Sequence, residues 1–524
     1  MPAVGASFKP FPNELLLEIF CGLHRGDLIH VVQASHKFHD LALRLLYRDV
    51  VWTDPLLYLH SLPLWNARPA FEDVPRSLVI GLCQERRDHV VAADVVELDG
   101  SLRRHVQMPS YAQMMASIAA MVAPHEAHRL VRHKIQRAAS SYLYRVMTQQ
   151  VAAFTSLSSL AFKHAILPGN FYAILEALPT LRILSLETCS ITSESKPPQY
   201  DLSLMPITEL TLLDIDVHRT APHPLLIATA LKLRTLHCDM SACAFRMFTK
   251  KLPGGGGHTV PPELRSIHFH MPEKRFWPAN MLDFSENTYY FIEFLKMCPE
   301  IRHITIGGFM PTISLPDHIA PALQSYKGPL LAASSFARGR SVSKIELVDL
   351  ETGPDLWEWI KSLQTLAQCQ SSIRELSITI PSWDDEIIHA VVNLFPELRK
   401  FHVIYYKRCI SEDTVLAIGP HFAALLPHLN TLHLYSPAMK SAATLLNPKH
   451  AENSVERSPP FTEEEAEREL QGSVGSWDRY CPNLREVQLL PGFVWRRADS
   501  RKGEATAAWD KRGYLMEDGE RSYL

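Results

Sequence analysis

The sequence has 524 residues, 53 Lys and Arg against 56 Asp and Glu, a formal charge of -3 and 46% hydrophobic residues. This length fits two to four domains or one long repetitive domain, and the balanced charge gives no support for a nucleic-acid or membrane partner. The 9 cysteines form no CxxC pair, and neither a signal peptide nor a membrane-length apolar run is present, so we expect a cytoplasmic or nuclear protein that is not secreted.

After a disordered N-terminus at residues 1–10, the pattern predicts a helical module at residues 11–52. Pro12 suits the first turn of a helix, and Asp27 and Ser35 are the expected caps of a second and a third helix. The apolar face of the first helix consists of Leu15, Leu16, Ile19, Phe20 and Leu23. So small a unit cannot bury all of its apolar surface, so part of it should meet a partner. Periodicity alone favours the alternative that this is the first part of a larger helical domain.

The module resembles an F-box. The string FPNELLLEIF, then Asp27–Leu28 and the segment VQASHKFHDL, follow the order of that motif, and the ending LYRDVVW resembles fungal F-box proteins. Phe11 departs from the family, which usually has Leu there. The resemblance implies docking on the Skp-family adaptor, and through it on a cullin-RING ubiquitin ligase. The residues that it implies face the adaptor are Phe11, Pro12, Leu15, Leu16, Ile19, Leu28 and Val32.

Residues 53–150 are interpreted as a junction of mixed helix and strand. The pattern φ-x-x-φ-x-φ, with φ apolar, then recurs from Leu157, Leu181, Ile207, Leu233, Leu264, Ile301, Val342, Ile373, Leu398, Leu429 and Leu484. Helical patterns lie between these strings, and several stop at a proline just before the next string. Such repetition predicts an α/β solenoid at residues 151–493, with parallel strands on the concave side and helices outside. It resembles an irregular leucine-rich repeat. An ordinary α/β domain with a parallel sheet is the alternative.

The repeats are degenerate. The full leucine-rich consensus has Asn or Cys five residues after the second apolar position, and only Cys189 meets it, so we expect irregular turns. Long steps between strings predict loops at residues 254–257 and 315–339 and an acidic loop insertion at 447–476. The acidic cluster is interpreted as a solvated helix or a disordered loop. Residues 494–524 are expected to form a mobile tail or an atypical cap.

The residue between the last two φ positions should point away from the core, toward the concave side. This column is polar or small throughout, and His237 should neighbour His268 as His402 should neighbour His433. A solvent-facing column is polar in any protein, yet this face is the best candidate for binding a protein substrate. The residues chosen for that role are His237, His268, His270, Glu346, His402, His433 and Tyr435.

Nucleotide-binding, hydrolase and metalloprotease motifs are absent from the sequence. The histidines of HEAHRLVRH at 125–133 favour a solvated basic helix over a metal site, and Asp384 and Asp385 favour helix capping over acid-base chemistry. We therefore expect no catalytic residue, metal or cofactor. The sequence predicts the substrate-recognition subunit of a Skp-cullin-F-box ubiquitin ligase. Two alternatives stay open: an F-box/repeat interaction scaffold outside ubiquitination, and, more weakly, an enzyme with an unrecognised site.

Overall fold

The chain divides into two compact units, Met1–Cys238 with Thr259–Glu263, and Asp239–His258 with Leu264–Leu524. The computed structural model describes residues 11–53, 58, 72–81, 146–167, 170–191, 202–217, 224–240, 245, 248, 260–271, 282–308, 310, 313–348, 355–369, 372–407, 410, 412–438, 462–498 and 509–513. The predictions for residues 1–10, for loop 254–257, for the histidines at 125–133 and for most of the junction fall outside these ranges.

Three helices open the first unit: α1 (Asn13–Cys21), α2 (Arg25–Ala34) and α3 (His36–Leu46). Ser35 caps α3 as predicted, since its hydroxyl accepts the Phe38 N–H at 3.2 Å. The predicted cap of α2 is wrong. His24 takes that role, accepting the Gly26 N–H on Nδ1 at 3.2 Å, and Asp27 lies in the first turn. The three helices bury a small core of their own, made of Leu16, Phe20, Leu28 and Ala42.

A sheet of 16 strands follows, mostly parallel, in which the strands are ordered as they occur in the chain. An ordinary open α/β sheet reverses its strand order at a switch point, so the sequential order excludes that alternative and fits a solenoid. The strands of the first unit are β1 (Asp49–Trp52), β2 (Ser77–Gly81), β3 (Ser159–Lys163), β5 (Ile183–Glu187), β7 (Glu209–Leu213) and β9 (Thr235–Asp239). The end of the predicted helical module, Asp49–Trp52, thus forms the first strand.

The second unit continues with β10 (Ser266–His270), β11 (His303–Gly307), β12 (Ser325–Gly328), β13 (Lys344–Val348), β14 (Glu375–Ser382), β15 (Lys400–Lys407), β16 (Thr431–Tyr435), β17 (Glu486–Gln488), β18 (Phe493–Arg497) and β19 (Trp509–Gly513). Every predicted string contains a strand, with its last two apolar positions buried, as Leu376 and Ile378 are in β14. Alternate side chains face the core, which is why the period-two pattern predicts these strands so well.

The predicted loop at 315–339 is wrong, because β12 and helix α10 (Leu330–Ala337) lie there. The φ-x-x-φ-x-φ string of β12 is incomplete, because Gly328 stands at its last apolar position. A Cβ at that position would lie 3.0 Å from the Ile306 carbonyl oxygen and 2.8 Å from the Tyr326 hydroxyl, so the close approach of neighbouring strands requires glycine. Strand β2 is hidden in a similar way, because Pro75 stands at its first apolar position.

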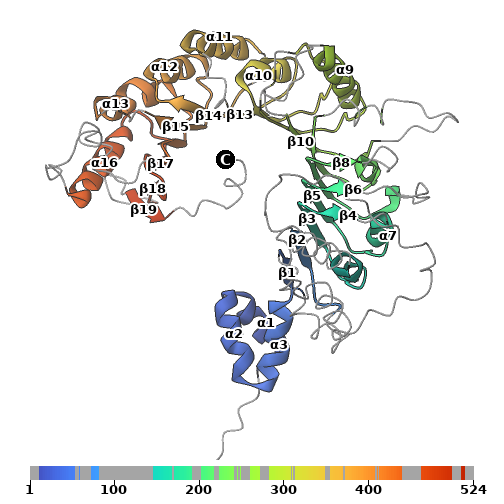
Figure 1. Ribbon diagram of the computed structural model, residues 1–524. Helices are drawn as coiled ribbons and strands as arrows, with labels where there is room; N and C mark the ends of the chain where they lie inside the picture. Colours follow the sequence, from blue (N-terminus) through green and yellow to red (C-terminus); the bar gives the residue numbers. More distant parts are fainter. Residues whose placement is uncertain are drawn as a thin grey trace, which may run out of the picture. The chain divides into compact units, whose positions relative to one another are not determined.

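Helices connect the strands. They are α7 (Phe171–Glu176), α9 (Leu282–Lys296), α11 (Leu356–Ala367), α12 (Asp385–Leu394) and α13 (Glu412–Ala417), which continues as a π-helical turn (Ile418–Phe422) and a 3-10 turn (Ala423–Leu425). In the first unit, 3-10 helices Leu202–Leu204 and Pro224–Thr229 replace α-helices. Within the second unit, α10 to α13 lie along one side of the strands, as the solenoid predicts (Figure 1).

The turns of the first unit are more regular than predicted. Short strands β4 (Ile166–Leu167), β6 (Ser190–Ile191) and β8 (Asp216–Val217) pair in a second sheet, and each follows a residue with φ of 53°, namely His164, Thr188 and Asp214. Backbone bonds hold this ladder, as when Ser190 N–H donates to the Ala165 carbonyl at 3.0 Å. The consensus side chain at Cys189 is therefore not needed in every repeat.

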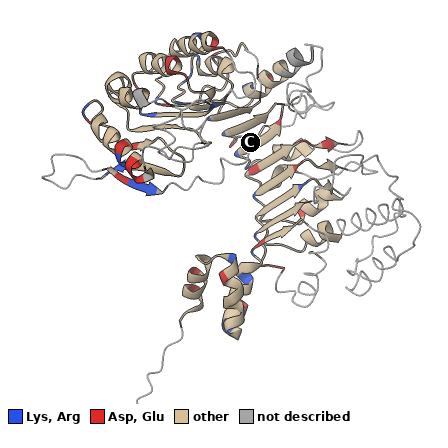
Figure 2. Cartoon of the chain, turned by 60° about the vertical axis from the view of Figure 1, so that its left-hand side comes forward, with Lys and Arg blue, Asp and Glu red and all other residues tan. Residues whose placement is uncertain are grey.

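The C-terminal end of the sheet reverses direction, because β18 and β19 pair antiparallel to their neighbours. The described part of the predicted acidic loop is mostly helix α16 (Glu463–Trp477), which begins with a capping box between Thr462 and Glu465. Acidic α16 lies beside basic β19 (Figure 2), and Lys511 Nζ reaches both Glu467 carboxylate oxygens at 2.7 Å. No helix among the described residues is long and apolar enough to span a membrane.

Candidate functional site

The helical module leaves a row of apolar side chains in solvent. Phe11, Leu15 and Ile19 are 61%, 45% and 54% exposed, and Leu15 and Ile19 share one face of α1 because they are four residues apart. The Lys37 ammonium donates to the Phe11 carbonyl oxygen at 2.9 Å, which fastens the start of this row to α3. Pro12 is exposed beside it. Large apolar side chains in such a row are typical of a protein-docking surface.

The remaining residues of the predicted adaptor set have a different place. Leu16 and Leu28 are 8% and 7% exposed and form the core of the module, and Val32 packs against that core while half-buried. Leu16 and Leu28 therefore hold the helices together, whereas Val32 contributes to the core and keeps part of its side chain at the surface. The exposed apolar row therefore consists of Phe11, Pro12, Leu15 and Ile19.

The predicted polar column exists in both units. In the first unit the register aligns Ala161, Ser185, Thr211 and His237, after the two valines Val51 and Val79 of β1 and β2. In the second unit it aligns His268, Thr305, Lys327, Glu346, Ser377, His402, His433 and Gln488. His237 and His268 belong to different units, so their expected proximity stays a prediction.

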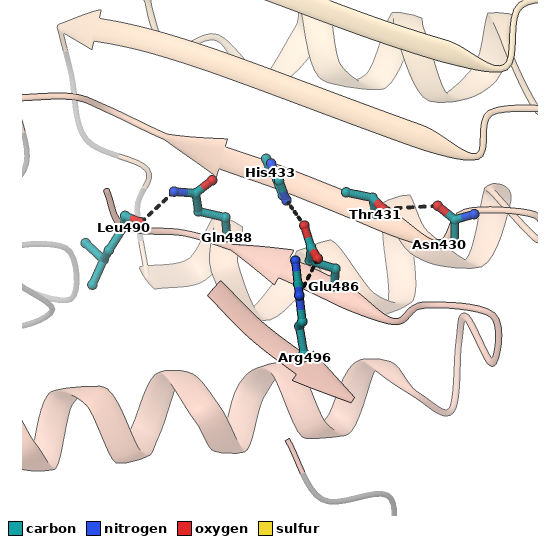
Figure 3. A network of polar contacts seen from close by, with 7 residues as sticks. All are labelled: Asn430, Thr431, His433, Glu486, Gln488, Leu490 and Arg496. Atoms are coloured by element: carbon teal, nitrogen blue, oxygen red, sulfur yellow. Dashed lines mark hydrogen bonds and ion pairs between the residues drawn. The ribbon is translucent and has the colours of Figure 1, made fainter. Parts of the chain in front are cut away.

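The expected pair of His402 and His433 is confirmed. Their rings stack with centroids 4.3 Å apart, inclined by 15°. Glu486 accepts a hydrogen bond from His433 Nε2 at 2.9 Å and binds Arg496 Nε at 2.7 Å (Figure 3). Burial first, and then the charges of His433, Lys400 and Lys344, lower the pKa of His402 to about 3. Burial also lowers the pKa of His433, against the opposing effect of Glu486. Both rings are therefore neutral near pH 7.

Of the other predicted substrate residues, His270 is exposed at the end of β10, and His237 and His268 are half-buried. The Nε2 of His268 lies 3.1 Å from the Ser266 hydroxyl. Glu346 forms an ion pair with Lys327 at 2.6 Å, which the sequence prediction missed because the strand of Lys327 was missed. A ligand can reach these side chains.

Tyr435 and His433 are only 6% exposed, so the polar face is closed at β16. The sequence prediction placed both on an open surface, because strand alternation indicates the direction of a side chain but not what covers it.

Asp384 caps α12 as predicted, accepting the Glu386 N–H at 2.9 Å.

Among the described residues, no group of three or more His, Cys, Asp or Glu side chains is placed to hold a metal ion. Comparison with protein-family models and with curated proteins finds no match for this chain. The features available for a functional argument are therefore the apolar row on the helical module and the polar face of the sheet.

Proposed function

We propose that this chain is a fungal-type F-box protein that acts as the substrate-recognition subunit of a Skp-cullin-F-box ubiquitin ligase. The apolar row would dock on the Skp-family adaptor, and the polar face of the repeats would bind the protein to be modified. Catalysis would then come from other subunits through proximity.

The observation that carries this proposal is the exposure of Phe11, Leu15 and Ile19 on a module that already has its own core. A module stabilised internally has no structural use for three large apolar side chains in water. Because about half of each side chain is still exposed, its burial at an interface contributes about 1 to 1.5 kcal/mol, and together the three can act as anchors.

The test is co-purification of the full-length chain with a Skp-family adaptor. We expect the double variant Leu15→Asp, Ile19→Asp to lose roughly a hundredfold or more in adaptor affinity, because two anchors are replaced by charges. The matched control, Leu204→Asp with Leu416→Asp, changes two other leucines that are 75% and 55% exposed and should bind the adaptor normally.

Failure of the unaltered protein to bind any Skp-family adaptor would refute the docking role. Adaptor binding without recruitment of a cullin would instead identify the interaction scaffold outside ubiquitination. Both outcomes are read from the same purification, because cullin and adaptor are separate components.

A further inference from the structure

One position of the repeat lies at the rim of the sheet, immediately before each strand. Its carbonyl oxygen accepts two amide hydrogens from the next repeat, as Arg374 O does from Arg399 N–H at 2.8 Å and Lys400 N–H at 3.1 Å. The backbone thus fixes this column in register, while the side chains point outward at the edge. In the second unit the column consists of Arg265, Arg302, Gln324, Ser343, Arg374, Arg399, Asn430 and Arg485.

A groove of about 460 Å³ lies at this rim, across strands β11 to β16. Four permanent cations line it, Lys344, Arg374, Arg399 and Lys400, against the single carboxylate of Glu375. Glu375 is already paired, with Lys400 at 2.8 Å and Lys344 at 3.9 Å. Within the described part of the chain, Arg374 and Arg399 have no ion-pair partner, so the groove has an excess of positive charge.

His303, which also lines the groove, reports the same excess. Burial lowers its pKa, and the positive charges of Lys344 and Arg302 lower it further. Burial disfavours a charge of either sign, but the part of the shift that comes from Lys344 and Arg302 is electrostatic, and the same positive charges favour an anion.

We propose that this rim groove binds a carboxylate-rich, extended segment of the substrate protein. The guanidinium groups of Arg374 and Arg399 start from neighbouring strands about 4.8 Å apart, and each presents a planar fork that matches a carboxylate. Only the identification of the bound segment as a substrate rests on the proposed function. The groove needs no adaptor to bind an anion.

A nucleic acid fits the groove less well. Its phosphates are continuous, so one of them would lie against Glu375, whereas a protein segment can place a neutral or basic residue there.

The test is fluorescence anisotropy with the full-length protein and a labelled synthetic peptide in which glutamate alternates with serine. Its glutamine counterpart and a single-stranded oligonucleotide serve as comparison ligands. We expect Arg374→Gln with Arg399→Gln to weaken binding of the acidic peptide about tenfold at low salt. The matched control is Arg182→Gln with Arg265→Gln. It removes two exposed arginines that stand immediately before β5 and β10, whose carbonyl oxygens accept the same kind of backbone hydrogen bonds outside the groove, and it should keep the affinity.

The variant Glu375→Gln is expected to tighten binding, a result that misfolding cannot produce because misfolding weakens binding. Removal of the carboxylate frees Lys400 and ends repulsion of the ligand, so the affinity should rise about threefold. The proposal is overturned if the control pair weakens binding equally, if the glutamine peptide binds as well, if Glu375→Gln fails to tighten binding, or if the oligonucleotide binds better. These results do not involve the adaptor, so they stay separate from the docking experiment.

Discussion

His402 combines burial with like charges around it. The group faces His433, Lys400 and Lys344, and its Nε2 has no hydrogen-bond partner among the described residues. With a folded-state pKa of about 3 against an ordinary 6.5, the ring is neutral in both states above pH 6.5. As the pH falls below 6.5, only the unfolded chain takes up the proton. The free energy of unfolding is therefore not reduced by His402 above pH 6.5, and it falls as the pH is lowered from 6.5 toward 3.

We predict that lowering the pH from 7.5 to 5 destabilises the second unit by up to about 2 kcal/mol through His402. His433 acts in the same direction, because burial lowers its pKa as well. The variant His402→Phe keeps a stacked ring without a titratable group and should show a smaller loss. Urea unfolding at the two pH values measures this difference. An equal loss in the variant and the parent protein would show that His402 is not the source.

At the scale of elements, the end of α16 packs against the π-helical turn that contains Gly419. A Cβ at Gly419 would lie 2.7 Å from Trp477 Cδ1 and 3.1 Å from Tyr480 Cδ2, and Trp477 is buried. The turn and the helix can approach this closely only because residue 419 lacks a side chain.

We predict that Gly419→Ala destabilises the protein by about 1 to 3 kcal/mol, because the indole ring has no room to move. The matched variant Gly472→Ala, within α16, places its methyl group where no atom lies within 4 Å, and should stabilise the helix by about 0.5 to 1 kcal/mol. Thermal unfolding distinguishes the two. A Gly419→Ala protein as stable as the parent would mean that α16 does not dock as described.

The elements predicted well from sequence are the strands in which apolar residues alternate with the same period as the buried side chains. The string around Leu376 predicts β14 because its alternate residues face the core. Strand β12 was missed because close strand approach, which no pattern of hydrophobicity records, requires Gly328. The rim arginines were overlooked although a signal exists: Arg follows the first apolar residue in strings such as LRILSL, IRELSI and LRKFHV. Tyr435 is buried at a position where strand alternation alone predicts an exposed side chain.

At the scale of the whole molecule, the outer strand of a long sheet exposes backbone groups that can recruit another chain, and short strands with charged side chains reduce that risk. Here β18 and β19 reverse direction, and buried Trp495 and Trp509 lie on these two strands. Both strands lie within or at the start of the segment 494–524, for which the sequence predicts a mobile tail or an atypical cap, and of which the structure describes 494–498 and 509–513.

We predict that a chain ending at Pro491 associates in a concentration-dependent way, because the edge of β17 is then unpaired. A chain ending at Gly513 keeps both capping strands and should stay dispersed. Light scattering during dilution distinguishes the two. Equal behaviour of both chains would show that the hairpin is not needed to protect the edge.

The rim column has a consequence for how such a protein can change over evolutionary time. Gln324 and Ser343 accept the same pair of backbone hydrogen bonds as Arg374, so folding at this position places little demand on the side chain. Substitutions there can alter the charge of the groove without disturbing the repeats. Related chains could thus change the charge of this rim one residue at a time, with each step nearly neutral for stability.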